Sequence, residues 1–264
     1  MNSVLLKTLW DRRWFTLGWT LGFTAFAALM TSFYPAMHQD GALDSLVANM
    51  PKAFEGLIGN LTYLKSFDTY LASQLFDIRL PLIAGIMAII LAQGISTNEE
   101  RSGELRSVLA LPISRTRLLL EKWVALLIIT LVAVVGLGVG IYITVPVTTG
   151  AELEFTAFLK LGLMTWLLMV TYGTVAFAIG MMTGNKGVTS LVSILVIIGS
   201  FILSTFGSVV DWLADYEKFS LIHYFPATDI VQYGIAKKDV LVLLLVTVIM
   251  LVAAWAVFRR RNVR

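Results

Sequence analysis

Six long stretches of the chain contain no Asp, Glu, Lys or Arg, and this pattern constrains the fold more than any other feature. They cover residues 14–37, 80–98, 123–151, 161–185, 187–210 and 241–258. A helix needs about 20 mostly apolar residues to cross about 30 Å of hydrocarbon, and each stretch meets or approaches that length. Only 14% of the 264 residues are charged, whereas roughly a quarter are charged in a soluble domain. We therefore predict an all-α membrane protein.

The sequence predicts one transmembrane domain over residues 1–264, with six membrane helices. The predicted spans are approximately 14–37, 78–97, 122–146, 159–183, 187–210 and 239–258. The longer connections are an outer loop at 38–77, a segment at 97–122 and an outer, re-entrant-like segment at 211–238.

The distribution of Lys and Arg predicts the orientation of the spans. Basic residues gather at the N-terminus, in the 97–122 segment, at Lys186 and in the tail at 259–264, whereas the other connections carry more acidic residues. Because basic connections remain on the cytoplasmic side, we place both termini there. An even number of spans agrees with this orientation, because it places both termini on the same side of the membrane.

Three connections have patterns of their own. Residues 1–13 place apolar side chains at helical spacing among basic ones, which predicts an amphipathic helix at the membrane interface. A basic flank that only fixes orientation explains the same residues equally well. The 38–77 loop is long enough to contain short helices. The aromatic 211–238 segment forms either re-entrant helices above a pathway or an aromatic belt that anchors the last two spans.

Small residues recur at helical spacing inside the spans. Three G-x-x-x-G pairs, at 18/22, 136/140 and 180/184, predict close helix packing. In the fifth span Ser193, Ser200, Ser204 and Ser208 share one face. We predict that this serine face lines a pathway or a dimer interface, and the alternative is ordinary packing between helices. Both interpretations turn the face away from lipid.

Motifs for catalysis or nucleotide binding are absent from the sequence. It contains no H-E-x-x-H motif and no G-x-x-x-x-G-K-[ST] phosphate loop, and His38 and His223 both fall in predicted outer loops. The spans also lack the ionisable groups common in proton- and voltage-driven transporters. We expect no catalytic residue, no metal site, no cofactor bound by this chain and no nucleic-acid partner. Any driving force then enters from outside the bilayer.

The 97–122 segment is the densest cluster of mixed charge in the chain. Thr97 and Glu100 have the spacing of a capping box, which predicts a helix starting near Asn98. Pro112 ends that helix, and Ser114 can cap a second helix that continues into the third span. The first helix either docks a partner or rests on lipid headgroups.

Residues 99–105, 109–115 and Lys122 resemble the type 2 ABC-exporter permease family, the membrane subunits that pair with a separate ATP-binding-cassette ATPase. The shared pattern is an acidic pair, Gly, Leu, an apolar run, Pro-x-Ser-Arg and a Lys that opens the next span. This chain has Glu104 where the family usually has Thr. Residues 51–59, 70–81 and 225–226 extend the resemblance.

The resemblance implies that residues 99–111 form a coupling helix seated in a cleft of the ATPase, and that residues 1–13 form the connecting helix beside it. The implied docking residues are Glu99, Glu100, Arg101, Gly103, Glu104, Leu105, Val108, Leu109, Pro112 and Arg115. ATP and Mg²⁺ would be bound by the ATPase. A second permease, identical or related, would complete the pathway among membrane lipids.

The resulting expectation is a multi-pass permease subunit of a prokaryotic inner (plasma) membrane that exports a hydrophobic or amphiphilic substrate. One alternative is a scaffold or sensor subunit that binds an ATPase without transport. The other is a membrane-embedded enzyme, which would require nucleophilic or ionisable residues clustered at a membrane face.

Overall fold

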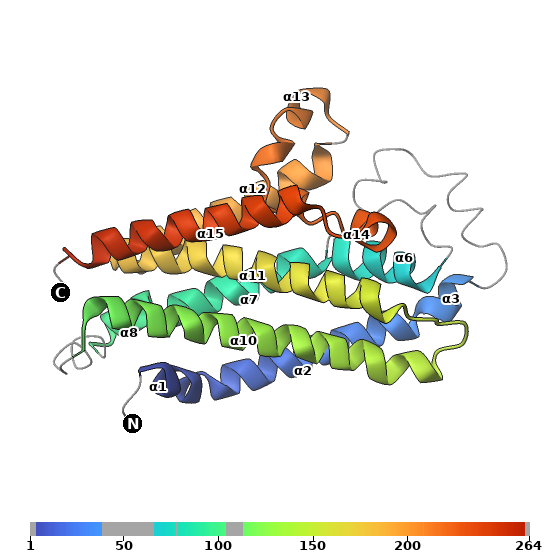
Figure 1. The fold of residues 1–264 in the computed structure, drawn as a ribbon, viewed down its shortest axis with the longest axis horizontal. Helices are drawn as coiled ribbons and strands as arrows, with labels where there is room; N and C mark the ends of the chain where they lie inside the picture. The colour runs from blue at the N-terminus through green and yellow to red at the C-terminus, as the bar shows by residue number, and fades with distance from the viewer. Residues whose placement is uncertain (1–3, 39–65, 78, 104–112, 208, 262–264) are drawn as a thin grey trace.

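The computed structural model consists of six long helices that run side by side (Figure 1). It describes residues 4–38, 66–77, 79–103, 113–207 and 209–261. The helices long and apolar enough to cross a membrane are Arg13–Ala36, Arg79–Glu100, Arg115–Val147, Phe155–Thr183, Lys186–Phe206 and Lys237–Phe258. The predicted six-span, all-helical fold is confirmed, and the described residues contain no strand.

The first four spans and their extensions contain α2 (Arg13–Ser32), α3 (Tyr34–His38), α7 (Arg79–Ile95), α8 (Thr97–Arg101), α10 (Arg115–Thr144), η3 (Val145–Val147) and α11 (Phe155–Thr183). The last two spans are α12 (Lys186–Phe206) and α15 (Lys237–Phe258). Shorter elements connect them: α1 (Val4–Asp11), α6 (Phe67–Leu71), the π-helix η2 (Ala72–Asp77), α13 (Asp211–Ala214), η4 (Glu217–Phe219), η5 (Ile222–Tyr224) and α14 (Ala227–Tyr233).

Side-chain caps set the start of two spans. The Ser114 hydroxyl accepts a hydrogen bond from the Arg117 N–H at 3.2 Å, so α10 begins where the sequence predicts. The Asn185 carboxamide oxygen accepts from Gly187 N–H at 2.9 Å and starts α12. The Ser114 cap satisfies one of the amide groups that a helix leaves without a partner at its start, and Asn185, which also accepts from Val188 N–H at 3.2 Å, satisfies two.

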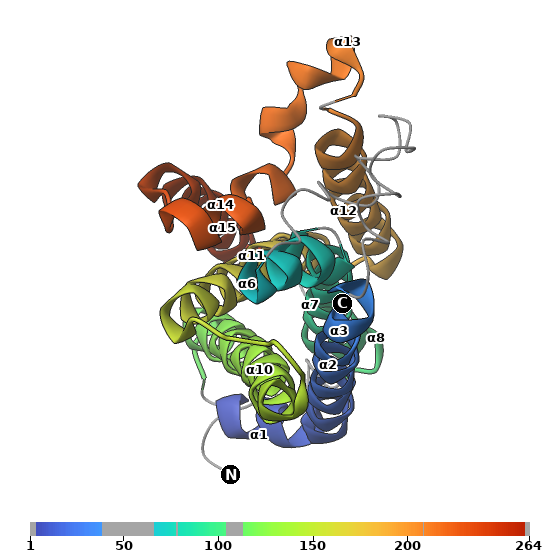
Figure 2. The same cartoon turned by 90° about the vertical axis from the view of Figure 1, so that its right-hand side faces the viewer.

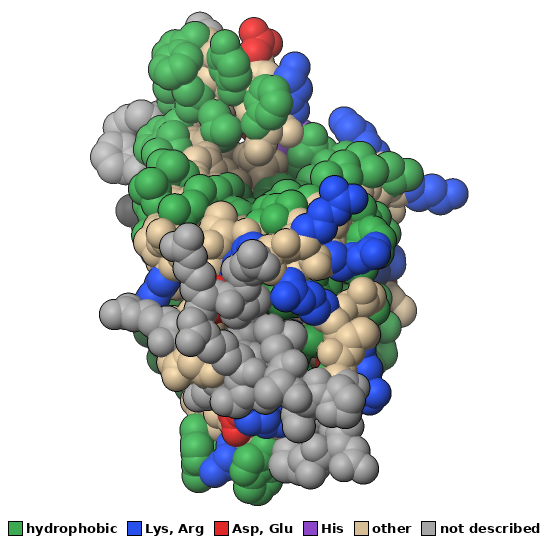
Figure 3. Space-filling model, turned by 90° about the vertical axis from the view of Figure 1, so that its left-hand side faces the viewer, with side chains coloured by type: hydrophobic (Ala, Val, Ile, Leu, Met, Phe, Trp, Pro, Cys, Tyr) green, Lys and Arg blue, Asp and Glu red, His purple; other side chains and the backbone are tan. Residues whose placement is uncertain are grey.

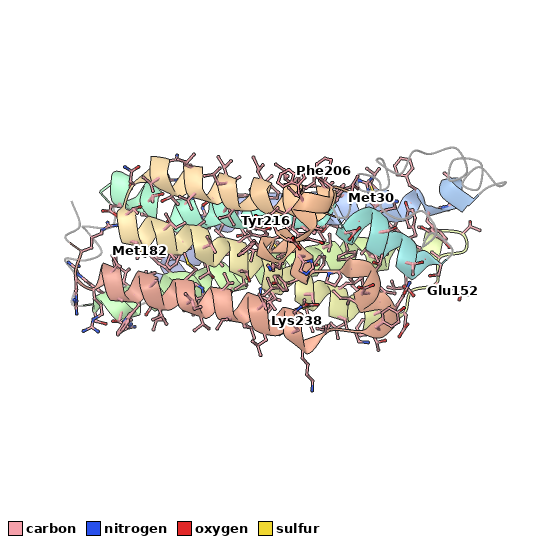
Figure 4. The ribbon with its side chains drawn as sticks, turned by 90° about the horizontal axis from the view of Figure 1, so that it is seen from above. Met30, Glu152, Met182, Phe206, Tyr216 and Lys238 are labelled. Carbon is pink, nitrogen blue, oxygen red and sulfur yellow. The ribbon has the colours of Figure 1, made fainter. Side chains whose placement is uncertain are left out.

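Both ends of the described chain lie at the same end of the helix bundle, which we call the terminal end (Figure 1). Met182 lies near the terminal end and Glu152 at the opposite end (Figure 4). Lys and Arg side chains are prominent on the terminal end (Figure 3). An even span count and a basic end are what the orientation rule requires of a cytoplasmic face, and the cytoplasmic location stays a prediction.

Helix α11 is the centre of the bundle. It packs against α7 and α15, while α10 packs along α2 (Figure 2). Every residue of α11 from 168 to 181 is buried. By contrast, α12 and α15 each expose a broad apolar face, as expected where helices face lipid or another subunit.

Two of the three predicted glycine pairs make close contacts. Gly180 of the 180/184 pair lies against Ser96, where a β-carbon would approach the hydroxyl to 2.4 Å, and the 136/140 pair brings α10 against α2. A β-carbon at Gly140 would lie 2.3 Å from the Thr24 backbone oxygen, and one at Gly136 would lie 2.4 Å from a Thr20 methyl group. The Thr24 hydroxyl donates to the Gly136 carbonyl at 2.8 Å. Gly22, by contrast, has no neighbour within 4 Å, so the 18/22 pair makes no close contact in the single chain.

We predict that Gly140→Ala destabilises the protein by about 1–3 kcal/mol, because the new methyl group meets backbone that cannot move aside. Gly22→Ala is the matched control and should be neutral or slightly stabilising, since Ala favours a helix by about 1 kcal/mol over Gly. Thermal unfolding in detergent compares the two. Equal stability of both variants would contradict the packing interpretation.

The short helices α6 and η2 lie at the end of the bundle opposite the termini (Figure 1), within the 38–77 loop in which the sequence predicts short helices. The Ser66 hydroxyl caps α6 in a capping box with Thr69, and the Tyr70 hydroxyl donates to the Met30 carbonyl at 3.0 Å. Residues 51–59 lie outside the described part.

The 211–238 segment forms four short helical turns between the last two spans. Trp212, Tyr216, Phe219 and Tyr233 are exposed and Phe225 is buried. The short helices are present, whereas a position above a pathway and an anchoring role at the membrane interface both stay predictions.

Asp77 at the end of η2 is the most perturbed acid outside the spans. Burial, followed by the nearby charge of Asp229, raises the pKa of its carboxyl group from 3.8 to about 6. The folded state therefore binds this proton more tightly than the unfolded state does. The contribution of protonated Asp77 to the free energy of unfolding is therefore fully present below about pH 4, and it is lost as the pH rises through about 6.

We predict that Asp77→Asn stabilises the protein at neutral pH, because an amide has no charge to desolvate. The gain over wild type should be near zero at about pH 4 and approach an order of 3 kcal/mol above about pH 7. Thermal unfolding across this range measures it. A constant difference at all pH values would show that Asp77 does not titrate between the two states.

Candidate functional site

The carboxyl ends of three spans, α7, α11 and α15, lie at the terminal end. The last carbonyl groups of a helix have no partner within the helix and carry the negative end of its dipole. Here each of the three ends is bound by a basic side chain from another element. These contacts, and the acids that join them, form the site.

Two cations bind the end of α7. Lys122 Nζ, on α10, donates to the Ile95 carbonyl at 2.8 Å. The guanidinium of Arg12, between α1 and α2, donates to the Gly94 carbonyl. Lys122 is completely buried, although it lies at the border of an apolar span. Such a charge is tolerated only when it is paired and hydrogen-bonded.

Glu99 of α8 is the charged partner of Lys122, and the two side chains form a direct ion pair. The Glu99 side chain is 12% exposed and the Lys122 side chain 1%. The pair therefore joins α8 to the third span and, through the Ile95 carbonyl, to the end of the second.

Arg261, which follows α15, binds the end of α11. Its Nη1 donates to the Met181 carbonyl at 2.9 Å, and its Nη2 forms an ion pair with Glu100 of α8. Gly184 makes room for this arrangement, because a β-carbon there would lie 2.6 Å from the Arg261 guanidinium and 2.7 Å from the Glu100 carboxylate. Its φ of 64° also ends α11 in the left-handed conformation.

The end of α15 is bound by Arg115, from the first turn of α10. Arg115 Nη1 donates to the Phe258 carbonyl at 3.0 Å and also to the carbonyl of Arg261. The indole N–H of Trp255 donates to the Thr116 hydroxyl at 3.1 Å. The start of the third span and the end of the sixth are therefore held together.

Helix α1 joins the same region. Its Leu5 N–H donates to the Glu121 carboxylate at 2.9 Å, and Glu121 also pairs with Arg117 at 2.6 Å. Val4 and Thr8 are buried, whereas Leu6 and Trp10 are 57% and 61% exposed. This division into a packed face and an exposed apolar face agrees with the predicted interfacial helix.

We name six of these residues the helix-end cluster: Arg12, Glu99, Glu100, Arg115, Lys122 and Arg261. Two adjacent carboxylates of α8 hold two of its cations, and those cations bind the ends of two different spans. Helix α8 is therefore connected to α7, α10, α11 and the segment that follows α15.

The structure places only part of the predicted docking set. Glu99 and Glu100 are largely buried in ion pairs within the chain, and Arg115 binds the end of α15. Gly103, with a φ of 80°, follows the end of α8. The remaining members lie outside the described residues, namely Glu104, Leu105, Val108, Leu109 and Pro112, and the side chain of Arg101 is likewise not described. Docking to an ATPase stays a prediction.

The predicted capping box at Thr97 is wrong. Helix α8 has no side-chain cap, because Thr97 Oγ1 donates back to the Gln93 carbonyl at 3.3 Å and Glu100 binds Arg261. The Glu100 carboxylate, which would have closed the capping box, instead forms an ion pair with Arg261.

The serine face of the fifth span lies largely inside the chain. Ser193 and Ser200 are buried, and the Ser200 hydroxyl accepts from Leu221 N–H at 3.2 Å. Ser204 is half-buried and Ser208 lies outside the described residues. In the single chain Ser200 is bound to the 211–238 segment, whereas the buried Ser193 hydroxyl has no hydrogen-bond partner within the described part of the chain. A role in a pathway, in a dimer interface or in ordinary helix packing stays a prediction.

Sequence reasoning missed the roles of Arg12, Lys122 and Arg261 in binding helix ends. A basic residue beside an apolar stretch is the only signal that these positions offer, and it does not identify a distant partner. No group of three or more potential metal ligands occurs among the described residues.

Residues 9–259 match the family model of the C-terminal domain of the multidrug efflux system permease Rv1217c. The chain belongs to this family. A search of curated proteins found no match. Family membership and the six apolar helices make the protein a multi-pass permease of the cell membrane, with a role in transport rather than catalysis. They also agree with the resemblance to type 2 ABC-exporter permeases.

We predict that Lys122→Met destabilises the permease by about 3–5 kcal/mol, because it leaves Glu99 buried without its cation. The double variant Lys122→Met/Glu99→Gln should recover much of this loss, since no unpaired charge remains. Thermal unfolding of the wild type, Lys122→Met, Glu99→Gln and the double variant gives the coupling energy between the two side chains. If the two single effects simply add, the ion pair contributes nothing to stability.

Proposed function

We propose that the permease is the membrane subunit of an ATP-binding-cassette exporter. A separate ATPase binds ATP and Mg²⁺ and docks on the 97–122 segment. Two permease chains, identical or related, enclose the pathway for a hydrophobic or amphiphilic substrate. Membership of a multidrug efflux permease family supports export.

The observation that carries this proposal is the connection of α8 to several spans through the helix-end cluster. Ion pairs join its two carboxylates to Lys122 and Arg261, and these cations bind the ends of α7 and α11. A partner that displaces α8 therefore moves these spans together. A loop resting on lipid headgroups would not need such connections.

In this proposal the residues that contact the ATPase differ from part of the set that the family resemblance implies. Glu99 and Glu100 act as internal connectors, since their side chains are only 12% exposed. The ATPase contacts the residues that follow them, 102–112, and the cluster transmits the movement. Closure of two ATPases on ATP would thereby move the spans and change access to the pathway.

Purification and reconstitution test the proposal. The permease, isolated from its native membranes in mild detergent, should carry an ATP-binding-cassette ATPase. In liposomes this complex should hydrolyse ATP faster when a transported amphiphile is added. An ATPase that binds without any stimulation or transport would favour the scaffold or sensor alternative. Absence of any ATPase would contradict the proposal.

A charge exchange separates internal coupling from direct docking. We expect Glu100→Arg and Arg261→Glu each to reduce transport-linked ATP hydrolysis, because each breaks the ion pair. The double variant should recover part of the activity; recovery is incomplete because a carboxylate at position 261 cannot donate to the Met181 carbonyl as Arg261 does. No recovery, together with lost ATPase binding in Glu100→Arg alone, would show that Glu100 contacts the ATPase directly.

A further inference from the structure

An apolar groove runs between α10 and α11 on the outside of the bundle. Its volume is about 360 Å³, within the range of sites that hold one small ligand. Leu131, Val135 and Tyr142 of α10 line one wall, and Phe158, Gly162 and Trp166 of α11 line the other. The helix-end cluster contributes no residue to it.

Two glycines and one fixed tryptophan create the groove. A β-carbon at Gly162 would approach Val134 no closer than 3.7 Å, and one at Gly138 would lie 3.4 Å from Phe158, so side chains could occupy this space. The Trp166 indole N–H donates to the Leu127 carbonyl at 3.1 Å and to the Thr130 hydroxyl at 3.2 Å. Its polar atom is therefore satisfied internally, and the ring presents hydrocarbon to the groove.

The length of the groove matches one leaflet of a bilayer. From Leu131 to Tyr142, α10 rises about 16 Å at 1.5 Å per residue, and half of a hydrocarbon core of about 30 Å is about 15 Å. These residues form the half of α10 remote from the terminal end, and the lining residues of α11 belong to its first half, which follows Glu152 (Figure 4).

We propose that the groove binds one acyl chain of a membrane phospholipid, in the leaflet remote from the terminal end. An extended acyl chain suits a space of about 360 Å³ that is as long as one leaflet and lined by hydrocarbon. At the mouth of the groove Tyr142 and Phe155 are 71% and 63% exposed, where aromatic rings contact the headgroup region.

Photolabelling tests the site without reference to transport. The full chain is reconstituted in phosphatidylcholine vesicles that carry a diazirine midway along one acyl chain, irradiated, digested and mapped by mass spectrometry. Adducts should concentrate on residues 131–142 and 155–166, above the level on exposed residues of other spans such as Leu195 and Val248. Equal labelling of all lipid-facing residues would overturn the proposal.

Filling the groove should abolish this preference. Gly162→Leu occupies it from α11 and Val139→Phe from α10, and both should lose the groove adducts while labelling of Leu195 and Val248 persists. Gly22→Leu is the matched control, because Gly22 also faces open space within a span, and it should change nothing. Unfolding temperatures verify that the variants fold. If either Gly162→Leu or Val139→Phe fails to fold, the other still tests the proposal.

Two further results would identify a different occupant. Preferential labelling by a photoreactive single-chain amphiphile over the phospholipid would assign the groove to such a molecule. Crosslinks from these residues to another polypeptide would assign it to a subunit contact. Either result overturns the phospholipid assignment, and neither depends on whether an ATPase drives the permease.

Discussion

The structure depends on hydrogen bonds to the backbone carbonyl groups at the carboxyl ends of its membrane helices. A helix that ends at the membrane border has carbonyl groups without partners, and these are costly to leave unpaired. In this protein Lys122, Arg12, Arg261 and Arg115 bind the ends of α7, α11 and α15. The cations come from three parts of the chain, namely the α1–α2 junction, the start of α10 and the segment after α15. By satisfying the helix ends, they also hold the bundle together at that end.

The same requirement explains why acidic residues follow the second span directly. A buried cation needs a counter-charge as well as carbonyl oxygens, and Glu99 and Glu100 supply it for two of the four cations. Helix α8 thereby becomes the point at which the second, third, fourth and sixth spans are joined. No ionisable group in the apolar interior of a span is needed to join these spans, because the ion pairs that join them lie at the terminal end.

The sequence predicted those features that depend on local pattern. Charge-free stretches revealed six spans, and Ser114 revealed the start of α10, because hydrophobicity and capping are readable within a few residues. The cluster could not be found in this way, since Glu100 and Arg261 are 161 positions apart. The local rule at Thr97 failed for the same reason, because a distant arginine binds the carboxylate that would have closed the capping box. Likewise G-x-x-x-G spacing occurs at both 136/140 and 18/22, but only the first pair meets a neighbouring backbone.

The length of α10 has a mechanical consequence. It runs for 30 residues without a break, which gives a continuous helix about 45 Å long. Arg115 and Lys122 are attached near one end, and the apolar wall facing α11 lies near the other. Gly136 and Gly140, which lie against α2, fall within the same stretch of α10 as that wall, so charged contacts hold one end of the helix and close backbone packing holds the other.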